Sequence, residues 1–343
     1  MISDYRLVAK SWQTPFVVLL GGCLISLVGF GARSSYGLYL GPMTLDLNWT
    51  RETFALAMAL QNLFWGICLP LAGILVDRYG PLWVVIGGAL IYALGTFGMT
   101  WVESSGSLYL AGGILVGTGV AFTSFSLVTA AMVRVVGVQR RSLVMGLCTA
   151  AGSLGQVLYS PITQGMISNH GWSSALVVTA VSVCLIIPLA FMLPNDPRVR
   201  DENVVHTGSI GAMREAFAHR GFLLLTAGFF VCGFHVAFIT VHLPVYVSDL
   251  GLGSMVGAIA ISLIGIFNIV GSLLSGAFGQ RFSKKCGLSG IYAARAVTLL
   301  VFLVAPKSEL TIYIFAATMG LLWLSTVPLT AGIIAQVFGI RYM

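Results

Sequence analysis

The chain has 343 residues, of which 57% are hydrophobic and only 8% are charged. A soluble domain carries about 25% charged residues, so this composition excludes an ordinary soluble fold. The 41 glycines favour closely packed membrane helices, because small residues let two backbones approach each other. The sequence therefore predicts a protein that folds in lipid.

Apolar stretches between charge clusters define the predicted membrane spans. A helix that crosses the hydrocarbon core needs about 20 mainly apolar residues. Such stretches predict spans near residues 16–39, 54–76, 82–102, 107–133, 142–167, 173–193, 221–247, 255–279, 287–305 and 309–338. The first one lacks a signal-peptidase type of site and continues into more apolar sequence, so we expect it to be retained. The predicted fold class is an all-α integral membrane protein.

The basic residues lie mainly on one side of these spans. If the amino terminus is cytoplasmic and the spans alternate, most of the 18 lysines and arginines fall in cytoplasmic segments, and only Arg51 and Lys307 fall in outer loops. This asymmetry follows the positive-inside rule. The formal charge of +7 then belongs to the membrane surface, and nucleic acid is not a predicted partner. We expect a multi-pass protein of a plasma membrane, of the bacterial inner-membrane type, with a cytoplasmic amino terminus.

A polar stretch divides the chain into two parts. Residues 194–220 carry prolines and charges of both signs and predict a cytoplasmic linker between residues 1–193, with six spans, and residues 221–343, with four. The stretch LAGILVDRY at 71–79 is similar to LSGAFGQRF at 274–282, at an offset of 203 residues. The sequence thus predicts two pseudo-repeated helix bundles, an arrangement typical of transporters.

Signals for catalysis are weak. Most of the six cysteines lie in apolar runs without CxxC or Cys/His spacing, which is typical of small buried residues. Gly113 and Gly117 have the spacing of a close helix-packing motif and not the context of a phosphate loop. Neither a nucleophile–base pair nor a dinucleotide fingerprint occurs. We therefore predict no enzyme activity, no cofactor and no metal site.

The stretch GILVDRYG, residues 73–80, resembles the signature G-x-x-x-D-[RK]-x-G of the major facilitator superfamily. It falls between the second and third predicted spans, at the cytoplasmic side. The resemblance implies a carrier that works by alternating access, with Asp77 and Arg78 in the inner gate. The family's additional basic residue after the last glycine is absent, because Pro81 and Leu82 stand there.

Longer stretches resemble the bacterial relatives of monocarboxylate and oxalate–formate carriers. They are GARSSYGLYLGPM (31–43), QNLFWG (61–66), RRSLVMGLCTAAGSLGQ (140–156), GFFVCGFHVAFITVHLP (228–244) and WLSTVPLTAG (323–332). Full members of that family have twelve spans, so the chain resembles a member without its last helix pair. We expect a fragment or truncated reading of a longer protein.

Two arginines lie inside predicted spans, Arg33 in the first and Arg295 in the ninth, and no acidic residue lies at mid-membrane depth. A central arginine costs about 2.5–3.5 kcal/mol on insertion scales. Buried cations without anionic partners favour an anion site, because a guanidinium can hold a carboxylate through two hydrogen bonds. The alternatives are that Arg33 reaches the headgroups and that Arg295 bonds backbone carbonyls.

The family resemblance bears on the same two residues. In the oxalate and monocarboxylate carriers, a basic residue of the first span and an arginine of the second half contact the substrate carboxylate. Arg33 matches the first place. The second-half arginine belongs to the eighth span of the family, whereas Arg295 is in the ninth.

Other polar residues inside the spans are candidates for the same site. Tyr36 follows Arg33 by one turn, and His235 and His242 share one face of the seventh span. The histidines could relay protons or donate hydrogen bonds, and the alternative is bonding between helices. The amides Gln61, Asn62, Gln156 and Asn268 fit either substrate contact or helix association. Trp65, one turn from Gln61, fits either a cavity wall or simple packing.

The first hypothesis for function is a secondary carrier of small organic anions, because buried arginines without buried carboxylates favour an anion over a cationic drug. The alternatives are a major facilitator carrier for a drug or a sugar, or a membrane sensor without transport. Any proton coupling is expected to use His235, His242 or Asp77, since Asn268 stands where proton symporters often carry a carboxylate. The predicted partners are a small organic anion, protons as coupling ion and the lipid bilayer, and the expected state is a monomer.

Overall fold

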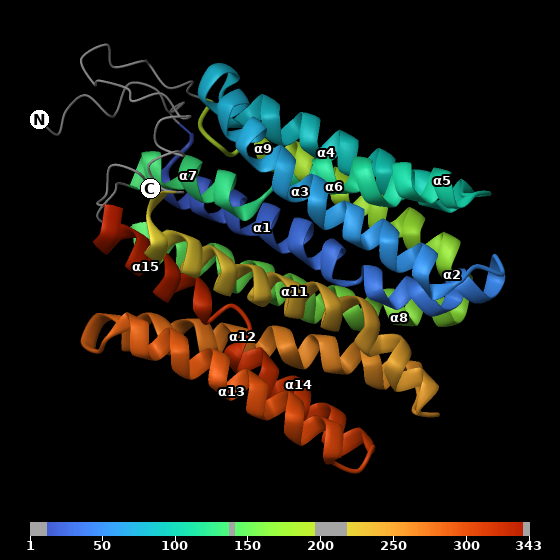
Figure 1. Cartoon of the computed structure of the whole chain (residues 1–343). Coiled ribbons are helices and arrows are strands. Elements are labelled where there is room, and N and C mark those ends of the chain that lie inside the picture. The colour runs from blue at the N-terminus through green and yellow to red at the C-terminus, as the bar shows by residue number, and fades with distance from the viewer. Residues whose placement is uncertain (1–11, 137–140, 196–217, 339–343) are drawn as a thin grey trace, which may run out of the picture.

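The computed structural model describes residues 12–136, 141–195 and 218–338 (Figure 1). Within these ranges every regular element is helical. Nine helical segments of the described chain are long and apolar enough to cross a membrane. Consecutive long segments run in opposite directions (Figure 1). The predicted all-α membrane fold is confirmed.

In the N-terminal half, residues 12–195, the first helix begins at Pro15 and is capped by the side chain of Thr14. Its elements are α1 (Pro15–Ser34), η2 (Tyr36–Tyr39), α2 (Leu40–Asp46), α3 (Arg51–Tyr79), α4 (Pro81–Gly98), η3 (Met99–Trp101), α5 (Ser105–Leu108), the π-helix η4 (Tyr109–Leu115), α6 (Val116–Phe122), α7 (Phe125–Val136), α8 (Arg141–Cys184) and α9 (Ile186–Ala190).

The C-terminal half, residues 218–338, follows the predicted linker, most of which lies outside the described residues. Its elements are α11 (Arg220–Asp249), α12 (Ser254–Arg281), α13 (Lys284–Val304), α14 (Glu309–Leu322) and α15 (Thr326–Phe338). The sequence repeat is visible here, because the same offset of 203 residues separates the first residues of α3 and α12.

The helix bundle has two ends. We call the proximal end the one at which α1 begins and α15 ends, and the distal end the one that carries the turns between α2 and α3 and between α11 and α12 (Figure 1). The two largest clusters of buried apolar side chains follow the halves. The first cluster consists mainly of residues of the N-terminal half, but Val241 and Val245 of α11 and Ala258 of α12 also belong to it. The second cluster lies wholly in the C-terminal half.

Gly171 explains why ten predicted spans correspond to nine segments. It interrupts the 47-residue apolar segment Val144–Ala190 with φ 80° and ψ 164°. Gly80, between α3 and α4, has nearly the same backbone, with φ 83° and ψ 160°. This region is essentially restricted to glycine. Gly171 therefore divides the segment into two arms, which correspond to the predicted spans 142–167 and 173–193.

Several predicted spans contain a break that the apolar pattern does not indicate, among them these three. α1 passes into η2 at Ser35, α6 and α7 are separated by Thr123 and Ser124, and α14 and α15 are separated by residues 323–325. Helix ends carry backbone groups without intrahelical partners. Inside a membrane such breaks are tolerated only where protein or a cavity surrounds them. They therefore indicate where a site can form.

Candidate functional site

Arg33 lies in the last turn of α1 and is 8% exposed. Its Nη2 donates a hydrogen bond to Asn62 Oδ1 at 2.6 Å, and its guanidinium carbon lies 4.4 Å from the centre of the Trp65 ring. Its Nε is buried and has no hydrogen-bond partner in the described chain. Asn62 and Trp65 thus hold the side chain, and its buried Nε–H is left without an acceptor among the described residues.

A cavity within the N-terminal half, which we call the N-cavity, lies beside Arg33. Its lining includes Ser26, Arg33, Trp65, Thr123, Ser124 and Phe125. Three buried polar atoms of this lining, Ser26 Oγ, Arg33 Nε and Trp65 Nε1, lack partners among the residues described. An unpaired buried polar group costs about 1–3 kcal/mol. Because the two nitrogens can only donate, the N-cavity is suited to a ligand that accepts.

The break between α6 and α7 adds to this character. Thr123 and Ser124 line the N-cavity, and α7 begins at Phe125, which also lines it. The N-terminus of a helix presents free N–H groups and a partial positive charge. The helix dipole and the guanidinium therefore favour the same sign of ligand charge.

A second cavity, which we call the interface cavity, lies on the other side of Arg33. It is lined by Arg33, Tyr36, Gly37, Met58, Gln61 and Asn62 from the N-terminal half and by Ala237, Thr240 and Val241 of α11. Arg33 is thus shared by a cavity inside one half and a cavity between both halves. No acidic side chain of the described chain lines either cavity.

The contacts of Arg33 offset the cost of burying its charge without neutralising that charge. Burying a central arginine costs about 2.5–3.5 kcal/mol. A cation over a desolvated tryptophan gains about 2 kcal/mol, and one hydrogen bond to a charged group gains about 1.5–3 kcal/mol. These two contacts offset the cost in part or in full, but neither supplies a negative charge. The positive charge of Arg33 therefore remains available.

Arg295 has a different environment. Its Nε and Nη2 donate to the carbonyl oxygen of Leu322, at 3.2 and 2.5 Å, and Nη2 also donates to the carbonyl of Trp323. These carbonyls lie at the break between α14 and α15, where they lack helical donors. Arg295 lines neither cavity beside Arg33. Its contacts match the alternative foreseen from the sequence, in which it holds backbone carbonyls.

The other predicted site residues divide between the interface cavity and helix packing. Tyr36 and Gln61 line the interface cavity, but the Tyr36 hydroxyl is bonded to Thr96 Oγ1 at 2.6 Å and Gln61 Nε2 donates to the Gly112 carbonyl. Their polar groups are therefore engaged inside the N-terminal half.

His235 and His242 line neither cavity. The ring of His242 lies 4.8 Å from that of Phe238, and Nδ1 of His235 is buried without a partner in the described residues. The structure therefore does not bring the histidines to Arg33.

Asn268 and Gln156 join the two halves. Asn268 Nδ2 donates to Ser153 Oγ at 2.7 Å, and Gln156 Nε2 donates to the Ile261 carbonyl at 2.8 Å. Further toward the distal end, Gln164 Nε2 donates to Ser254 Oγ at 3.1 Å. These contacts form a polar seam between α8 and α12. Asn268 is thus part of the seam, as the helix-association alternative foresaw.

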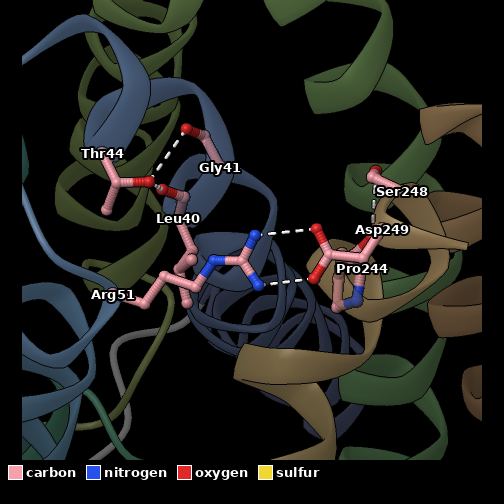
Figure 2. Close-up of polar contacts among 7 residues, drawn as sticks. All are labelled: Leu40, Gly41, Thr44, Arg51, Pro244, Ser248 and Asp249. Atoms are coloured by element: carbon pink, nitrogen blue, oxygen red, sulfur yellow. Dashed lines mark hydrogen bonds and ion pairs between the residues drawn. The ribbon is translucent and has the colours of Figure 1, made fainter. Parts of the chain in front are cut away.

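An ion pair links the two halves at the distal end. Arg51, at the start of α3, donates from Nη1 and Nη2 to the two carboxylate oxygens of Asp249, at 2.5 and 2.7 Å. Figure 2 shows this fork between the first turn of α3 and the end of α11, close to Ser248 and Pro244. Both side chains are about half exposed. Sequence reasoning placed Arg51 in an outer loop but missed its partner, 198 residues away.

The ion pair yields a prediction about the distal end. An exposed pair contributes at most about 1 kcal/mol, so Arg51→Gln should have little effect. Arg51→Asp should open the distal end, because two carboxylates would face each other. The double variant Arg51→Asp with Asp249→Arg should restore closure. Labelling of an introduced Ala258→Cys by a membrane-impermeant maleimide reports the opening, since Ala258 is buried in the cluster shared by both halves. Equal labelling in the single and double variants would contradict this role.

The predicted gate residues Asp77 and Arg78 end α3 at the proximal end. Both are exposed, and the Arg78 guanidinium lies 5.2 Å from the centre of the Tyr79 ring. Gly80 then turns the chain into α4. Their role in gating stays a prediction.

Comparisons with known proteins fit this architecture. The sequence profile of the Major Facilitator Superfamily matches residues 22–343. Monocarboxylate transporter 13 of Rattus norvegicus is 26% identical over 94% of this chain and 75% of its own length. The oxalate:formate antiporter of Oxalobacter formigenes is 24% identical over 98% of this chain and 79% of its own length.

Solved structures show the same fold at low identity. A bacterial homologue of the human lysosomal transporter Spinster superposes with a TM-score of 0.73, at 14% identity, over 95% of this chain and 75% of that one. The xylose transporter XylE of E. coli gives a TM-score of 0.65, at 16% identity, over 96% of this chain and 90% of its own. The chain belongs to the major facilitator superfamily and is a multi-pass membrane transporter and not an enzyme.

Proposed function

We propose that the protein is a secondary carrier that moves small organic anions, of the monocarboxylate class, across a plasma membrane by alternating access. The observation that carries this proposal is the buried Arg33 guanidinium, whose Nε has no partner in the described chain. Arg33 lines the N-cavity together with Ser26 and Trp65, each of which also has a buried polar atom unpaired among the described residues. The names of the rat and Oxalobacter relatives, which refer to monocarboxylates, oxalate and formate, support the same ligand class.

Other substrate classes fit the cavities less well. A cationic drug needs a negative charge, and the lining residues of both cavities are uncharged apart from Arg33. A sugar needs several free amides or hydroxyls. The amides of Gln61 and Asn62 and the hydroxyl of Tyr36 are already bonded within the protein, although Ser26 Oγ is unpaired in the described chain. A carboxylate satisfies the spare donors and the charge at once.

The contacts between the halves support alternating access. The seam between α8 and α12 and the Arg51–Asp249 pair hold the halves together from the middle of the bundle to the distal end. With a cytoplasmic amino terminus, the distal end faces the outside. We interpret this arrangement as a state closed to the outside, in which residues 1–193 and 221–343 act as the two moving bundles and Asp77 and Arg78 gate the inner side.

Uptake of labelled acids into proteoliposomes tests the proposal. The panel should contain formate, acetate, lactate and pyruvate, with oxalate as a dicarboxylate. Labelled glucose and a labelled quaternary ammonium drug are included as substrates that the alternative functions would transport. We expect uptake of at least one small carboxylate and none of glucose or the cation. Uptake confined to glucose or to the cation would overturn the assignment to organic anions.

Proton coupling is a separate proposal with its own test. Two groups that can bind a proton near neutral pH, His235 and His242, lie inside the membrane-spanning helix α11. If they couple proton movement to transport, replacing both with glutamine should flatten the pH dependence of carboxylate uptake while uptake at high pH persists. An unchanged pH profile would assign coupling to Asp77 or show that transport does not depend on protons.

A further inference from the structure

We infer that Asn62 sets the charge selectivity of the site, because its amide oxygen holds the Arg33 guanidinium in place without cancelling its charge. The inference rests on the proposed function, since it concerns how the same site distinguishes an anion from a neutral molecule. Asn62 does not need to touch the substrate. It acts through Arg33 as a positioning residue.

The amide of Asn62 is fixed at both ends. Its Nδ2 donates to the Met58 carbonyl, one turn earlier on α3, at 2.7 Å. Its Oδ1 therefore points toward Arg33 and accepts from Nη2 at 2.6 Å. This orientation satisfies the two polar groups of the amide. Because α3 anchors the amide, the guanidinium is oriented by the backbone of the neighbouring helix.

Every identified contact of the guanidinium is uncharged. Asn62 supplies a neutral acceptor, and the Trp65 ring covers one face at 4.4 Å. Neither lowers the net charge of the site, which stays at one positive charge. An aspartate has nearly the same shape as asparagine but would form an ion pair with Arg33, and the net charge of the site would then be zero.

The contact with Asn62 uses Nη2 and leaves Nε as a separate donor of Arg33. Arg33 and Trp65 both line the N-cavity, and Arg33 Nε and Trp65 Nε1 are buried donors that have no acceptor in the described part of the chain. One oxygen of a carboxylate can accept from Nε and the other from the indole N–H. The assignment for the substrate is thus a small carboxylate, bound by two donors that Asn62 and the stacked ring keep in position.

The test compares charge with shape. Equilibrium binding of pyruvate and of pyruvamide, which differ in charge, is measured on the purified protein and on the variants Asn62→Asp and Asn62→Leu. Asn62→Asp should lose about tenfold to a hundredfold in pyruvate affinity with little change for pyruvamide. Asn62→Leu keeps the positive charge and should still prefer pyruvate over pyruvamide. Asn169→Asp, the same exchange at an exposed position on α8, is the matched control and should bind as the wild type does.

The outcomes separate the two proposals. If the wild type binds none of the carboxylates in the uptake panel, the proposed function fails and the inference fails with it. If the wild type binds pyruvate and Asn62→Asp binds it equally well, only the inference is wrong. The inference is also wrong if Asn62→Leu no longer prefers pyruvate over pyruvamide, because an uncharged side chain at position 62 would then reduce the preference as much as a carboxylate does. Asn62→Leu therefore tests the inference even if Asn62→Asp does not fold.

Discussion

Replacing Arg33 with glutamine should abolish carboxylate transport while the protein still inserts and folds. The loss of a hydrogen bond to a charged group costs about 1.5–3 kcal/mol, which corresponds to roughly ten- to over a hundredfold in affinity. Folding should be unaffected or improved, because the variant no longer buries a charge whose insertion costs about 2.5–3.5 kcal/mol. Substrate affinity and the heat-unfolding midpoint, measured on the same preparation, separate the two effects.

The lysine variant sharpens the test of Arg33. Arg33→Lys keeps the charge but loses the planar fork that contacts Asn62 and the N-cavity together. We expect only partial recovery of affinity relative to Arg33→Gln. Arg295→Gln is the comparison in the other half and should lower stability more than affinity, because Arg295 holds the carbonyls of Leu322 and Trp323. Wild-type affinity in Arg33→Gln would show that Arg33 is only an anchor.

Replacing Gly37 with alanine should prevent the halves from closing at the distal end. A Cβ at Gly37 would overlap the backbone carbonyl oxygen of Thr240 on α11, which cannot turn away as a side chain would. Overpacking of this kind costs about 1–3 kcal/mol. The closed state should therefore lose roughly tenfold to a hundredfold in population, and uptake should fall with it. Labelling of Ala258→Cys by the impermeant maleimide should become faster.

The matched control for Gly37 lies one turn further along the chain. A Cβ at Gly41 would lie 3.5 Å from Val245 Cγ2, an ordinary contact. Gly41→Ala should therefore transport and label as the wild type does. If Gly37→Ala also behaves as the wild type, the close approach of η2 to α11 plays no part in the transport cycle.

Hydropathy was sufficient to predict the spans, because the requirement to bury backbone polar groups in lipid acts on each helix separately. The offset of 203 residues between 71–79 and 274–282 also separates the first residues of α3 and α12. The break between the predicted spans 142–167 and 173–193 was expected, but the sequence does not distinguish the positive φ of Gly171 from the backbone of the many helical glycines. The breaks at Thr123 and near Trp323 depend on tertiary surroundings and were not foreseen.

The candidate site could be predicted only in part. Arg33 was visible because a charge in an apolar run is costly and therefore conspicuous. Its partners were not, because Asn62 and Trp65 belong to another helix, and an amide in a span fits helix association equally well. Ser26, Thr123 and Ser124 were missed for the same reason, since hydroxyl residues are common in membrane helices.

Arg295 shows the limit of the same reasoning. The cost of burial marked it as a candidate, yet the carbonyls that it bonds become free only because α14 ends at Leu322. The pairing of Arg51 with Asp249 depends likewise on how the two halves meet. Contacts between distant parts of the chain thus required the structure.

A structure of the protein with a bound carboxylate tests the central claim most directly. The ligand should be the acid of the uptake panel that binds most tightly. We predict that its carboxylate lies in the N-cavity, with one oxygen about 2.7–2.9 Å from Arg33 Nε and the other accepting from Trp65 Nε1. A carboxylate bound at Arg295, or anywhere else without contact to Arg33, would contradict the account.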